Sequence, residues 1–232
     1  FWACAKNLLK TDFWQNRDVF ITGGGTLEKI DEVRYISNFS SGKMASSLAS
    51  SLYCMGATVH LVATKFENNI PNLINTTQVQ SSNEMINQLT QVIQTNQANT
   101  QIKAPYLFMA AAVSDYVPLS LQTGKLKKEK LGETFDLSLK QNIDILQSIN
   151  KKGIISIGFK AEMDINSAQK NATNMLSKKN LDAVCLNILK DSSSFGTDTN
   201  TIEFITKNSK NTISNSDKLS VAFEILKYAE TL

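Results

Sequence analysis

The sequence predicts an α/β fold in which a doubly wound, mostly parallel sheet carries a protruding antiparallel arm. Short β-prone runs alternate with segments of helical periodicity along the 232 residues, as in parallel strands joined by crossover helices. The first run, residues 19–22, is followed directly by three glycines, and a strand followed by a glycine-rich turn is typical of nucleotide or phosphate sites. The run 106–113 is apolar throughout, which indicates a central strand buried on both faces.

The first half of the chain predicts strands at 19–22, 57–63 and 106–113, separated by two helices. The first helix, 42–55, has apolar residues at helical spacing and stops at Gly56. The second helix runs to residue 96, because Ser81 and Glu84 have the spacing of a capping box. The intervening stretch 65–80 is polar and is expected to be a loop.

In the second half, Phe135, Leu137 and Leu139 alternate with polar residues, which predicts a half-exposed antiparallel strand that forms the arm. Asn142 is expected to cap a short helix to residue 150. Further strands are expected at 154–159, 183–186 and 202–206, and helices at 166–179 and 216–230. Ligands of such sheets bind beyond the carboxyl ends of the strands, so chemistry is expected in the segments that follow them.

Composition limits the function classes. The chain is 42% apolar and 19% charged with a net charge of +3, so its bulk charge does not predict nucleic-acid binding, and no apolar run is long enough to cross a membrane. Three widely spaced cysteines indicate reduced thiols and a cytoplasmic location. The single histidine, His60, argues against His-rich zinc sites and is expected to be an ordinary strand residue.

The chain is expected to hold one domain at 18–232, preceded at 1–17 by the tail of a linker or of another domain. The first residue is not Met, and residues 1–16 mix two tryptophans with lysines before the first strand-like run.

Two segments form a candidate anion site. Gly24 and Gly25 allow backbone N–H groups to approach an anion, although an ordinary structural turn explains them about as well. The residues Ser40, Ser41, Gly42 and Lys43 open a helix whose N-terminus carries partial positive charge; a plain serine cap with a solvated lysine is the alternative. Ser37 stands where a Walker A loop needs its first glycine, so that motif is excluded.

Charged residues follow the same ligand-side positions. Asp115, directly after the apolar run, suits a ribose hydroxyl or a metal-bound phosphate. Four lysines come next, at 125, 127, 128 and 130. They can either neutralise the charge of a polyphosphate or form a solvated face. The position of Lys125, after a strand on the ligand side, favours neutralisation of a polyphosphate for that residue. Glu28, Asp31 and Arg34 either orient a substrate or form a surface ion network.

The motifs resemble, in order, those of phosphopantothenoylcysteine synthetases. The opening signature is carried by ITGGGT at 21–26, VRYISN at 33–38 and SSGKM at 40–44. The likeness continues through AAAVSDY at 110–116, GKLKK at 124–128, NIDIL at 142–146, GFKAE at 158–162, KNLD at 179–182 and FGTDTN at 195–200. It covers residues 18–232 and implies a Rossmann-like fold.

This resemblance implies ligation of 4′-phosphopantothenate to L-cysteine, with CTP as co-substrate and Mg²⁺ as cofactor. CTP activates the carboxylate as an acyl-cytidylate with release of pyrophosphate, and the cysteine amine then displaces CMP. The implied catalytic residues are Asn38, Lys125 and Arg34. The implied nucleotide contacts, besides Lys125, are Met109, Ala110, Ala111, Asp115, Ile143, Asp144, Ile145, Leu146, Phe159 and Lys179. The metal ligands stay unassigned.

The alternating strand at 135–139 predicts a homodimer, in which the arm reaches across to the partner and helps to close its site, because an unpaired apolar strand would be an exposed edge. The resemblance also implies a flavin-dependent decarboxylase fused on the same chain. Two positions depart from the family pattern. Met175 stands where a lysine is usual, so that Lys178 or Lys170 is a candidate substitute, and Ile188 replaces an aspartate. Both departures bear on nucleotide affinity or specificity.

Two other function classes are alternatives. A nicotinamide-dependent reductase needs GxGxxG, but position 28 is Glu, and no tyrosine is followed four residues later by lysine. A non-enzymatic nucleotide-binding domain is the other alternative, and it predicts nucleotide binding without release of pyrophosphate.

Overall fold

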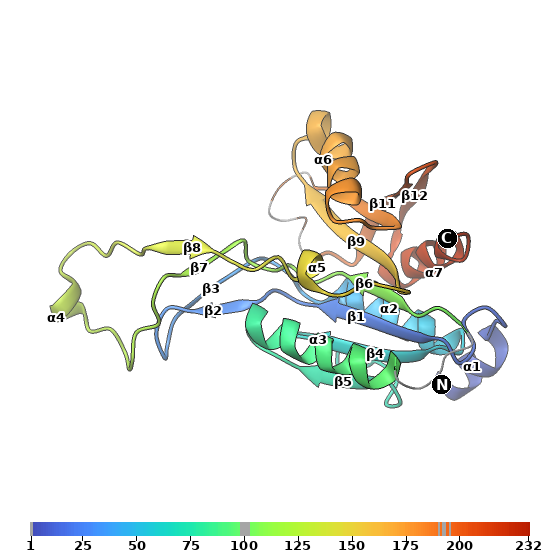
Figure 1. Ribbon diagram of the computed structural model, residues 1–232, viewed down its shortest axis with the longest axis horizontal. Helices are drawn as coiled ribbons and strands as arrows, with labels where there is room; N and C mark the ends of the chain where they lie inside the picture. The colour runs from blue at the N-terminus through green and yellow to red at the C-terminus, as the bar shows by residue number, and fades with distance from the viewer. Residues whose placement is uncertain (1, 98–102, 190, 192–193, 195) are drawn as a thin grey trace.

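A computed structural model describes residues 2–97, 103–189, 191, 194 and 196–232 (Figure 1). Within these residues the strands of the main sheet are β1 (Asp18–Gly23), β4 (Thr58–Ala63), β5 (Asn75–Gln78), β6 (Tyr106–Met109), β9 (Ile155–Glu162), β10 (Ala183–Ile188), β11 (Thr199–Thr206) and β12 (Lys210–Asp217). They lie in the order β12-β11-β10-β9-β6-β1-β4-β5. The pairs from β10 to β5 are parallel, whereas β11 and β12 are antiparallel. The predicted doubly wound, mostly parallel sheet is confirmed.

The chain changes direction across the sheet between β1 and β6. From β1 the order runs outward through β4 and β5, and β6 then returns to the other side of β1. Thr22 of β1 is paired with Met109 of β6 at the carboxyl ends of both strands. In open α/β sheets such a reversal leaves a crevice where the crossover connections diverge, so this edge is where a ligand is expected.

Helices cover both faces of the sheet (Figure 1). One apolar cluster joins the sheet to α2 (Lys43–Cys54) and α7 (Lys218–Ala229), with α1 (Trp2–Leu9) beside them. A second cluster, on the opposite face, joins it to α3 (Ser82–Gln97), α5 (Ile145–Ser148) and α6 (Ile165–Lys178). This two-faced burial explains why strands such as β6 are apolar at every position.

Local signals set most helix boundaries. At the predicted capping box of α3, Ser81 Oγ accepts from Glu84 N–H at 3.2 Å, and Glu84 accepts in return from Gln80 N–H at 2.8 Å. Asp217 caps α7 by accepting from Ser220 N–H at 3.0 Å. The predicted strand identity of His60 is confirmed: it lies in β4, 2.9 Å from Asp18 in β1.

The arm extends away from the main sheet (Figure 1). It contains two antiparallel pairs, β2 (Leu27–Lys29) with β3 (Tyr35–Ser37) and β7 (Tyr116–Pro118) with β8 (Leu139–Gln141), and the short helix α4 (Lys128–Leu131). The predicted antiparallel arm is therefore confirmed, but the strand proposed at 135–139 is wrong. Only Leu139 belongs to β8, because the ladder opposite β7 pairs residues 139–141, and beyond it one backbone bond, from Leu119 N–H to Ser138 O at 2.9 Å, continues the contact.

Other boundaries and elements also differ from the sequence prediction. The strand proposed at 106–113 ends at Met109, because Ala110–Val113 turn away from the ladder toward the segment after β1. Asn142 does not cap the following helix; Asp144 does, by accepting from Gln147 N–H at 3.0 Å, and α5 ends at Ser148. Strands β5 and β12 were not predicted, because their sequences lack the apolar pattern on which the prediction depended, and helix α1 lies in the segment 1–17 that was expected to be a preceding tail.

The segment before β1 packs on the same domain. Trp14 is fully buried in the first apolar cluster and stacks edge-on against Tyr106, with ring centroids 4.9 Å apart. Arg17 donates to Ala104 O at 2.6 Å and lies over the Phe13 ring, and burial lowers its pKa. The division into 1–17 and 18–232 stays a prediction.

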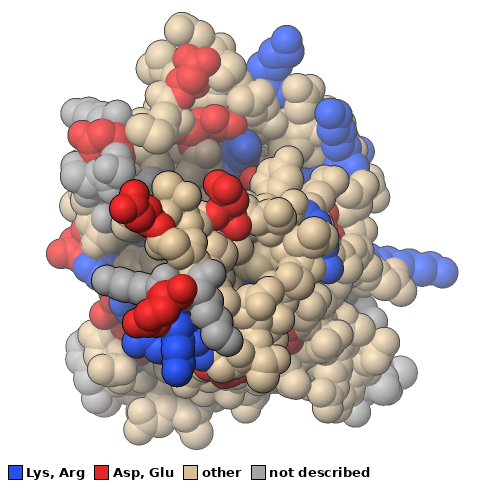
Figure 2. All heavy atoms as spheres, turned by 90° about the vertical axis from the view of Figure 1, so that its left-hand side faces the viewer, with Lys and Arg blue, Asp and Glu red and all other residues tan. Residues whose placement is uncertain are grey.

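No helix among the residues described is long and apolar enough to cross a membrane. Viewed from the end of the arm, the surface carries acidic and basic side chains interspersed among uncharged ones (Figure 2).

Candidate functional site

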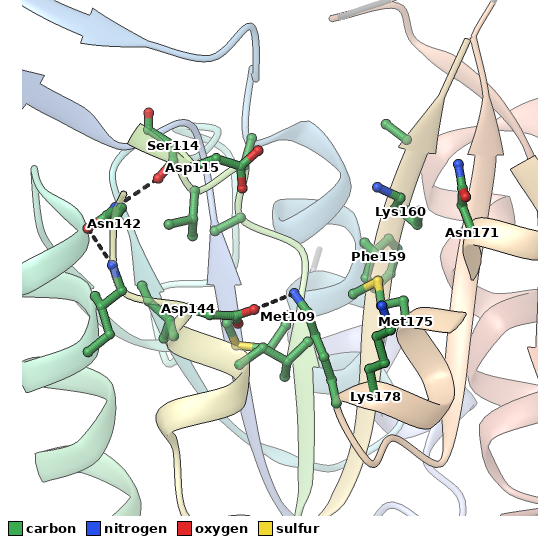
Figure 3. Close-up of a pocket in the computed structure, with 18 of the residues that line it drawn as sticks. Met109, Ser114, Asp115, Asn142, Asp144, Phe159, Lys160, Asn171, Met175 and Lys178 are labelled. Carbon is green, nitrogen blue, oxygen red and sulfur yellow. Dashed lines mark hydrogen bonds and ion pairs between the residues drawn. The ribbon is translucent and has the colours of Figure 1, made fainter. Parts of the chain in front are cut away.

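A cleft of about 810 Å³ lies beyond the carboxyl ends of β6 and β9, between α5 and α6. Ser114, Asp115 and Asn142 lie on one side of it, and Phe159, Lys160, Asn171, Met175 and Lys178 lie on the other (Figure 3). The remaining lining residues are Met109, Ala111, Ala112, Val113, Tyr116, Gln141, Ile143, Asp144, Ile145, Leu146, Ala161, Asn174 and Lys179. A cleft of this size at a topological switch point is a common place for a small-molecule site.

Backbone hydrogen bonds fasten the segment after β6 to the segment after β1. Ala112 N–H donates to Gly24 O at 2.8 Å, and Thr26 N–H donates to Ala112 O at 3.2 Å. Ser114 N–H then donates to Thr26 Oγ1 at 3.1 Å. The floor of the cleft at Ala112–Ser114 is thus fixed relative to the glycine turn.

Asn142 holds the rim of the cleft on the same side as Ser114 and Asp115 (Figure 3). Its amide nitrogen donates to Ser114 O at 2.8 Å, and its amide oxygen accepts from Ile143 N–H at 2.8 Å and from Ser82 Oγ at 3.3 Å. This side chain therefore joins the segment after β6, the start of α3 and the residues that lead into α5. The sequence prediction missed this role, because it read Asn142 only as a local helix cap.

Charges in the cleft are partly compensated within the protein. Lys179 Nζ lies 2.9 Å from Asp144 Oδ2, and Lys160 Nζ lies 3.2 Å from Glu162 Oε1. Lys178, on α6, faces the cleft with no acidic partner within ion-pair distance among the residues described (Figure 3). The cleft can therefore offer an uncompensated cation to an anionic ligand.

Most of the predicted nucleotide contacts come together in this cleft. The residues that line it are Met109, Ala111, Asp115, Ile143, Asp144, Ile145, Leu146, Phe159 and Lys179. Ala110 lies beside this lining without being part of it, and Lys125 lies in the arm with its side chain exposed. Met175 also lines the cleft, and of the two suggested substitutes for a lysine at that position, Lys178 lines it and Lys170 does not. The role of each residue stays a prediction.

Asn38 and Arg34 lie at different distances from this cleft. Asn38 is exposed, and its amide nitrogen donates to Ala112 O at 3.5 Å, which places it at the edge of the lining. Arg34 is bound to Asp31, with Nη2 2.6 Å from Oδ2, and donates to Leu126 O at 2.8 Å. The Arg34 guanidinium therefore joins two segments of the arm, the β2–β3 turn and the segment at Leu126.

The glycines of the predicted anion site are required by packing. A Cβ at Gly24 would lie 2.2 Å from Thr64 Oγ1, one at Gly25 would lie 2.5 Å from Asn38 O, and one at Gly42 would lie 2.0 Å from Lys65 O. Gly24 and Gly42 also have positive φ, at 78° and 74°. Packing explains these glycines whether or not an anion binds. The two interpretations of the segment, a structural turn and an anion site, therefore both stay open.

The serines and the lysine of this segment open α2. Ser40 and Ser41 are half-buried; the N-cap residue Gly42 has no side chain to cap α2, but Ser41 Oγ accepts from Lys43 N–H at 3.4 Å. Lys43 Nζ lies 2.5 Å from Asp198 Oδ1 and donates to Gly196 O at 3.0 Å. This pairing raises the pKa of Lys43 and lowers the pKa of Asp198. Lys43 is therefore already neutralised by the chain itself.

Lining residues that the sequence did not indicate are Asn171, Asn174 and Gln141. They come from the middle of α6 and from the arm, so no local motif links them to Met109 or Asp115. Among the described residues, no group of three or more His, Cys, Asp or Glu side chains is placed to hold a metal.

Comparison with known proteins decides the family. The family described as "DFP: DNA/pantothenate metabolism flavoprotein C-terminal domain" matches residues 14–232. The chain belongs to this family. The family resemblance drawn from the sequence motifs is thereby confirmed.

Named relatives agree with this family. The chain is 36% identical over 219 residues to the coenzyme A biosynthesis bifunctional protein CoaBC of Borreliella burgdorferi, covering 93% of this chain and 53% of that protein. It is 29% identical to the crystal structure of the C-terminal domain of a CoaBC protein, with a TM-score of 0.74, covering 95% of this chain and 97% of that one. A Cab2 mutant in complex with phosphopantothenate-cysteine has 17% identity and a TM-score of 0.63, covers 99% of this chain and 92% of that one, and shows a shared fold. The chain spans about half the length of the curated relatives it matches.

Proposed function

We propose that this chain is a ligase of coenzyme A biosynthesis that joins 4′-phosphopantothenate to L-cysteine. In this proposal CTP activates the carboxylate as an acyl-cytidylate with loss of pyrophosphate, and the cysteine amine then displaces CMP. Family membership supports the proposal, and so does the shared fold with a neighbour that holds phosphopantothenate-cysteine. The observation that carries it is the cleft, which collects the predicted nucleotide contacts from segments after β6, before α5, on β9 and after α6.

The chemistry explains why these residue types are suited to the task. A carboxylate becomes a good acyl donor only when one oxygen turns into a leaving group, and forming that group requires cations around the phosphates. Lys125 is proposed to supply one such cation. Asn38, at the edge of the cleft, is proposed to donate from its amide to the oxyanion that forms when the amine attacks.

Asp115 is suited to hold Mg²⁺ together with ligand phosphates. Mg²⁺ usually takes one or two carboxylates and keeps substrate phosphates and waters as its other ligands. Asp115 lines the cleft and is exposed, and its carboxylate makes no ion pair within the described residues. When bound there, the ion would spread the charge of the phosphates; a ribose hydroxyl is the other proposed partner of Asp115.

A homodimer is proposed from the arm. Large apolar side chains are exposed along it, namely Val33, Tyr35, Tyr116, Leu119, Leu121, Phe135 and Leu139. An exposed apolar surface of this kind is typical of an interaction site. In this proposal the arm reaches a second copy of the chain and helps to close its site. Light scattering of the purified chain is expected to show a dimer, and a fully active monomer would contradict the proposal.

The proposal also includes a flavin-dependent decarboxylase fused on the same chain. The relatives are named bifunctional, and this chain matches about half of their length. A cytoplasmic location is proposed with it, from the unpaired cysteines.

The test is a pyrophosphate-release assay with 4′-phosphopantothenate and CTP, ATP or no nucleotide. Pyrophosphate is expected only with phosphopantothenate present, and more with CTP than with ATP. Equal rates with both nucleotides would refute the CTP preference. Nucleotide binding without any release would refute the ligase and favour the binding-domain alternative.

Lys125→Gln sharpens this test. If Lys125 stabilises the phosphates in the transition state, the variant should slow single-turnover pyrophosphate release at saturating CTP far more than it weakens CTP binding. Lys127→Gln is the matched control, because Lys127 is exposed in the same segment. The side chains of Lys128 and Lys130 lie outside the described part of the chain. Equal small losses at positions 125 and 127 would mean that neither lysine is catalytic.

A further inference from the structure

Asp31 is an almost fully buried carboxylate in the turn between β2 and β3, with 1% of its surface exposed. Its Oδ1 accepts from Val33 N–H at 2.8 Å and from Arg34 N–H at 2.7 Å. Its Oδ2 accepts from Arg34 Nε at 3.1 Å, from Arg34 Nη2 at 2.6 Å and from Leu126 N–H at 3.0 Å. A buried carboxylate is tolerated only when it is hydrogen-bonded in this way.

The last of these bonds reaches a segment far away in the sequence. Leu126 is held at both of its backbone groups, because its N–H donates to Asp31 and its carbonyl accepts from Arg34 Nη2 at 2.8 Å. Just before it, Gly124 O accepts from Glu32 N–H at 3.4 Å. Both neighbours of Lys125 are therefore tied to the β2–β3 turn.

The charges of Asp31 and Arg34 strengthen the hydrogen bonds between the β2–β3 turn and Leu126. The Arg34 guanidinium holds the pKa of Asp31 well below its usual range, so the carboxylate stays charged at any working pH. Hydrogen bonds to a charged acceptor are stronger than those between neutral groups. Lys125 itself is exposed, and among the described residues no acid lies within ion-pair distance of it.

We propose that Asp31 is a positioning residue that presents Lys125 to the reaction, by fixing the Gly124–Leu126 backbone on the β2–β3 turn. The catalytic part of this inference rests on the proposed function. Asp31 is not suggested to touch substrate. Its carboxylate acts on the backbone of Leu126, so that the Lys125 side chain projects from an anchored segment instead of a free loop.

Asp31→Asn is the decisive variant. An amide keeps one acceptor oxygen but replaces the other by an NH₂ group, which would face the N–H donors of Arg34 and Leu126. Glu32→Gln is the matched control, because Glu32 is the next residue, is exposed, and its side chain makes only a 3.6 Å ion pair with Lys29. If Asp31→Asn fails to fold, Arg34→Lys removes the bond to Leu126 O while it keeps the charge.

The first readout is amide hydrogen exchange over residues 122–127, together with trypsin cleavage after Lys125 and Lys127. Asp31→Asn is expected to speed exchange at Leu126 at least tenfold and to increase cleavage, whereas Glu32→Gln leaves both unchanged. Exchange and cleavage as in the wild type would overturn the proposal.

The second readout separates positioning from general destabilisation. Asp31→Asn should lower kcat for pyrophosphate release with little change in the KM for CTP, and adding it to Lys125→Gln should cause no further loss, because Asp31 is proposed to act only through the Lys125 side chain. Losses that multiply would overturn the positioning role. A wild-type chain that releases no pyrophosphate would refute the proposed function, whereas the exchange at Leu126 would still decide whether Asp31 holds the segment.

Discussion

Replacing Gly42 by alanine tests how tightly the start of α2 is built against the loop after β4. Gly42 has φ of 74°, and a Cβ there would lie 2.0 Å from the carbonyl oxygen of Lys65 and 2.8 Å from its carbonyl carbon. These are backbone atoms, so the clash cannot be relieved by a rotamer change. Gly153 offers a matched reference, because its φ is 76° and no heavy atom lies within 4 Å of its Cβ position.

The expected cost can be worked from the two positions. A left-handed alanine costs about 1–2 kcal/mol, and the reduced entropy of the unfolded chain returns about 0.4–1 kcal/mol, so Gly153→Ala should lose about 1 kcal/mol. Gly42→Ala carries the same loss plus about 1–3 kcal/mol for overpacking, hence about 2–4 kcal/mol in total. For a chain of this size 1 kcal/mol shifts Tm by about 2–4 °C.

Urea and thermal unfolding of both variants, followed by circular dichroism, provide the measurement. Gly42→Ala should unfold at a clearly lower temperature than Gly153→Ala, with the same m-value as the wild type. Equal losses in the two variants would show that backbone conformation alone sets the cost. The reasoning about close approach of Lys65 to α2 would then be wrong.

Three further outcomes are expected. Asn38→Asp should slow attack by cysteine roughly 10²- to 10³-fold and let acyl-cytidylate accumulate in a single turnover, visible by mass spectrometry; normal ligation would remove Asn38 from the site. Ser220 lowers the pKa of Asp217 below its ordinary 3.8, so the stability gained from the charged cap is present above that pH and is lost as the pH falls through the folded pKa. The stability difference between wild type and Asp217→Asn should therefore shrink in acid unfolding curves, and a constant difference would contradict it. Trp14 Nε1 is buried without a hydrogen-bond partner among the described residues. The free energy of unfolding of Trp14→Phe should therefore lie within about 1 kcal/mol of the wild-type value, whereas Trp14→Ala should lose about 3–5 kcal/mol. Equal losses in the two variants would mean that Nε1 is hydrogen-bonded.

The parts of the fold that bury apolar side chains were predictable from the sequence. The central strands β1, β4 and β6 and the helices α2 and α3 carry continuous or periodic apolar residues, and their pattern follows from packing between two helical layers. Strand β5 has the sequence NTTQ and is largely exposed, so its strand character comes only from pairing with β4. No local pattern records such a pairing.

The alternation at 135–139 was misread for a related reason. Phe135 and Leu139 are both about 44% exposed, so the alternating pattern does not report a buried face within this chain. The apolar run 106–113 likewise combines two environments, since Met109 ends the strand and Ala111–Val113 line the cleft. Apolar residues predict burial, but they do not distinguish a protein core from a ligand site or an interface.

The residues of the candidate site that belong to short sequence motifs were predictable. The residues that reach the site only because a helix packs back across the sheet were not. Asp115 and residues 143–146 follow recognisable signals, whereas Lys178 and Asn171 face the cleft because α6 packs back across the sheet. The bond from Asp31 to Leu126 spans 95 residues. Contacts at that separation are set by the tertiary fold.

The two borders of the main sheet have a consequence for the tendency of this protein to aggregate. β5 and β12 form the two borders of the main sheet. β5 presents Asn, Thr and Gln side chains, and β12 presents Lys210 and mostly small polar residues, with Ile213 buried in the core. An unpaired border strand is a template for open-ended strand addition, and polar or charged side chains discourage it. The large apolar side chains exposed on the arm lie away from both borders. The polar borders are therefore poor templates for open-ended strand addition, whereas the arm offers exposed apolar surface to a partner.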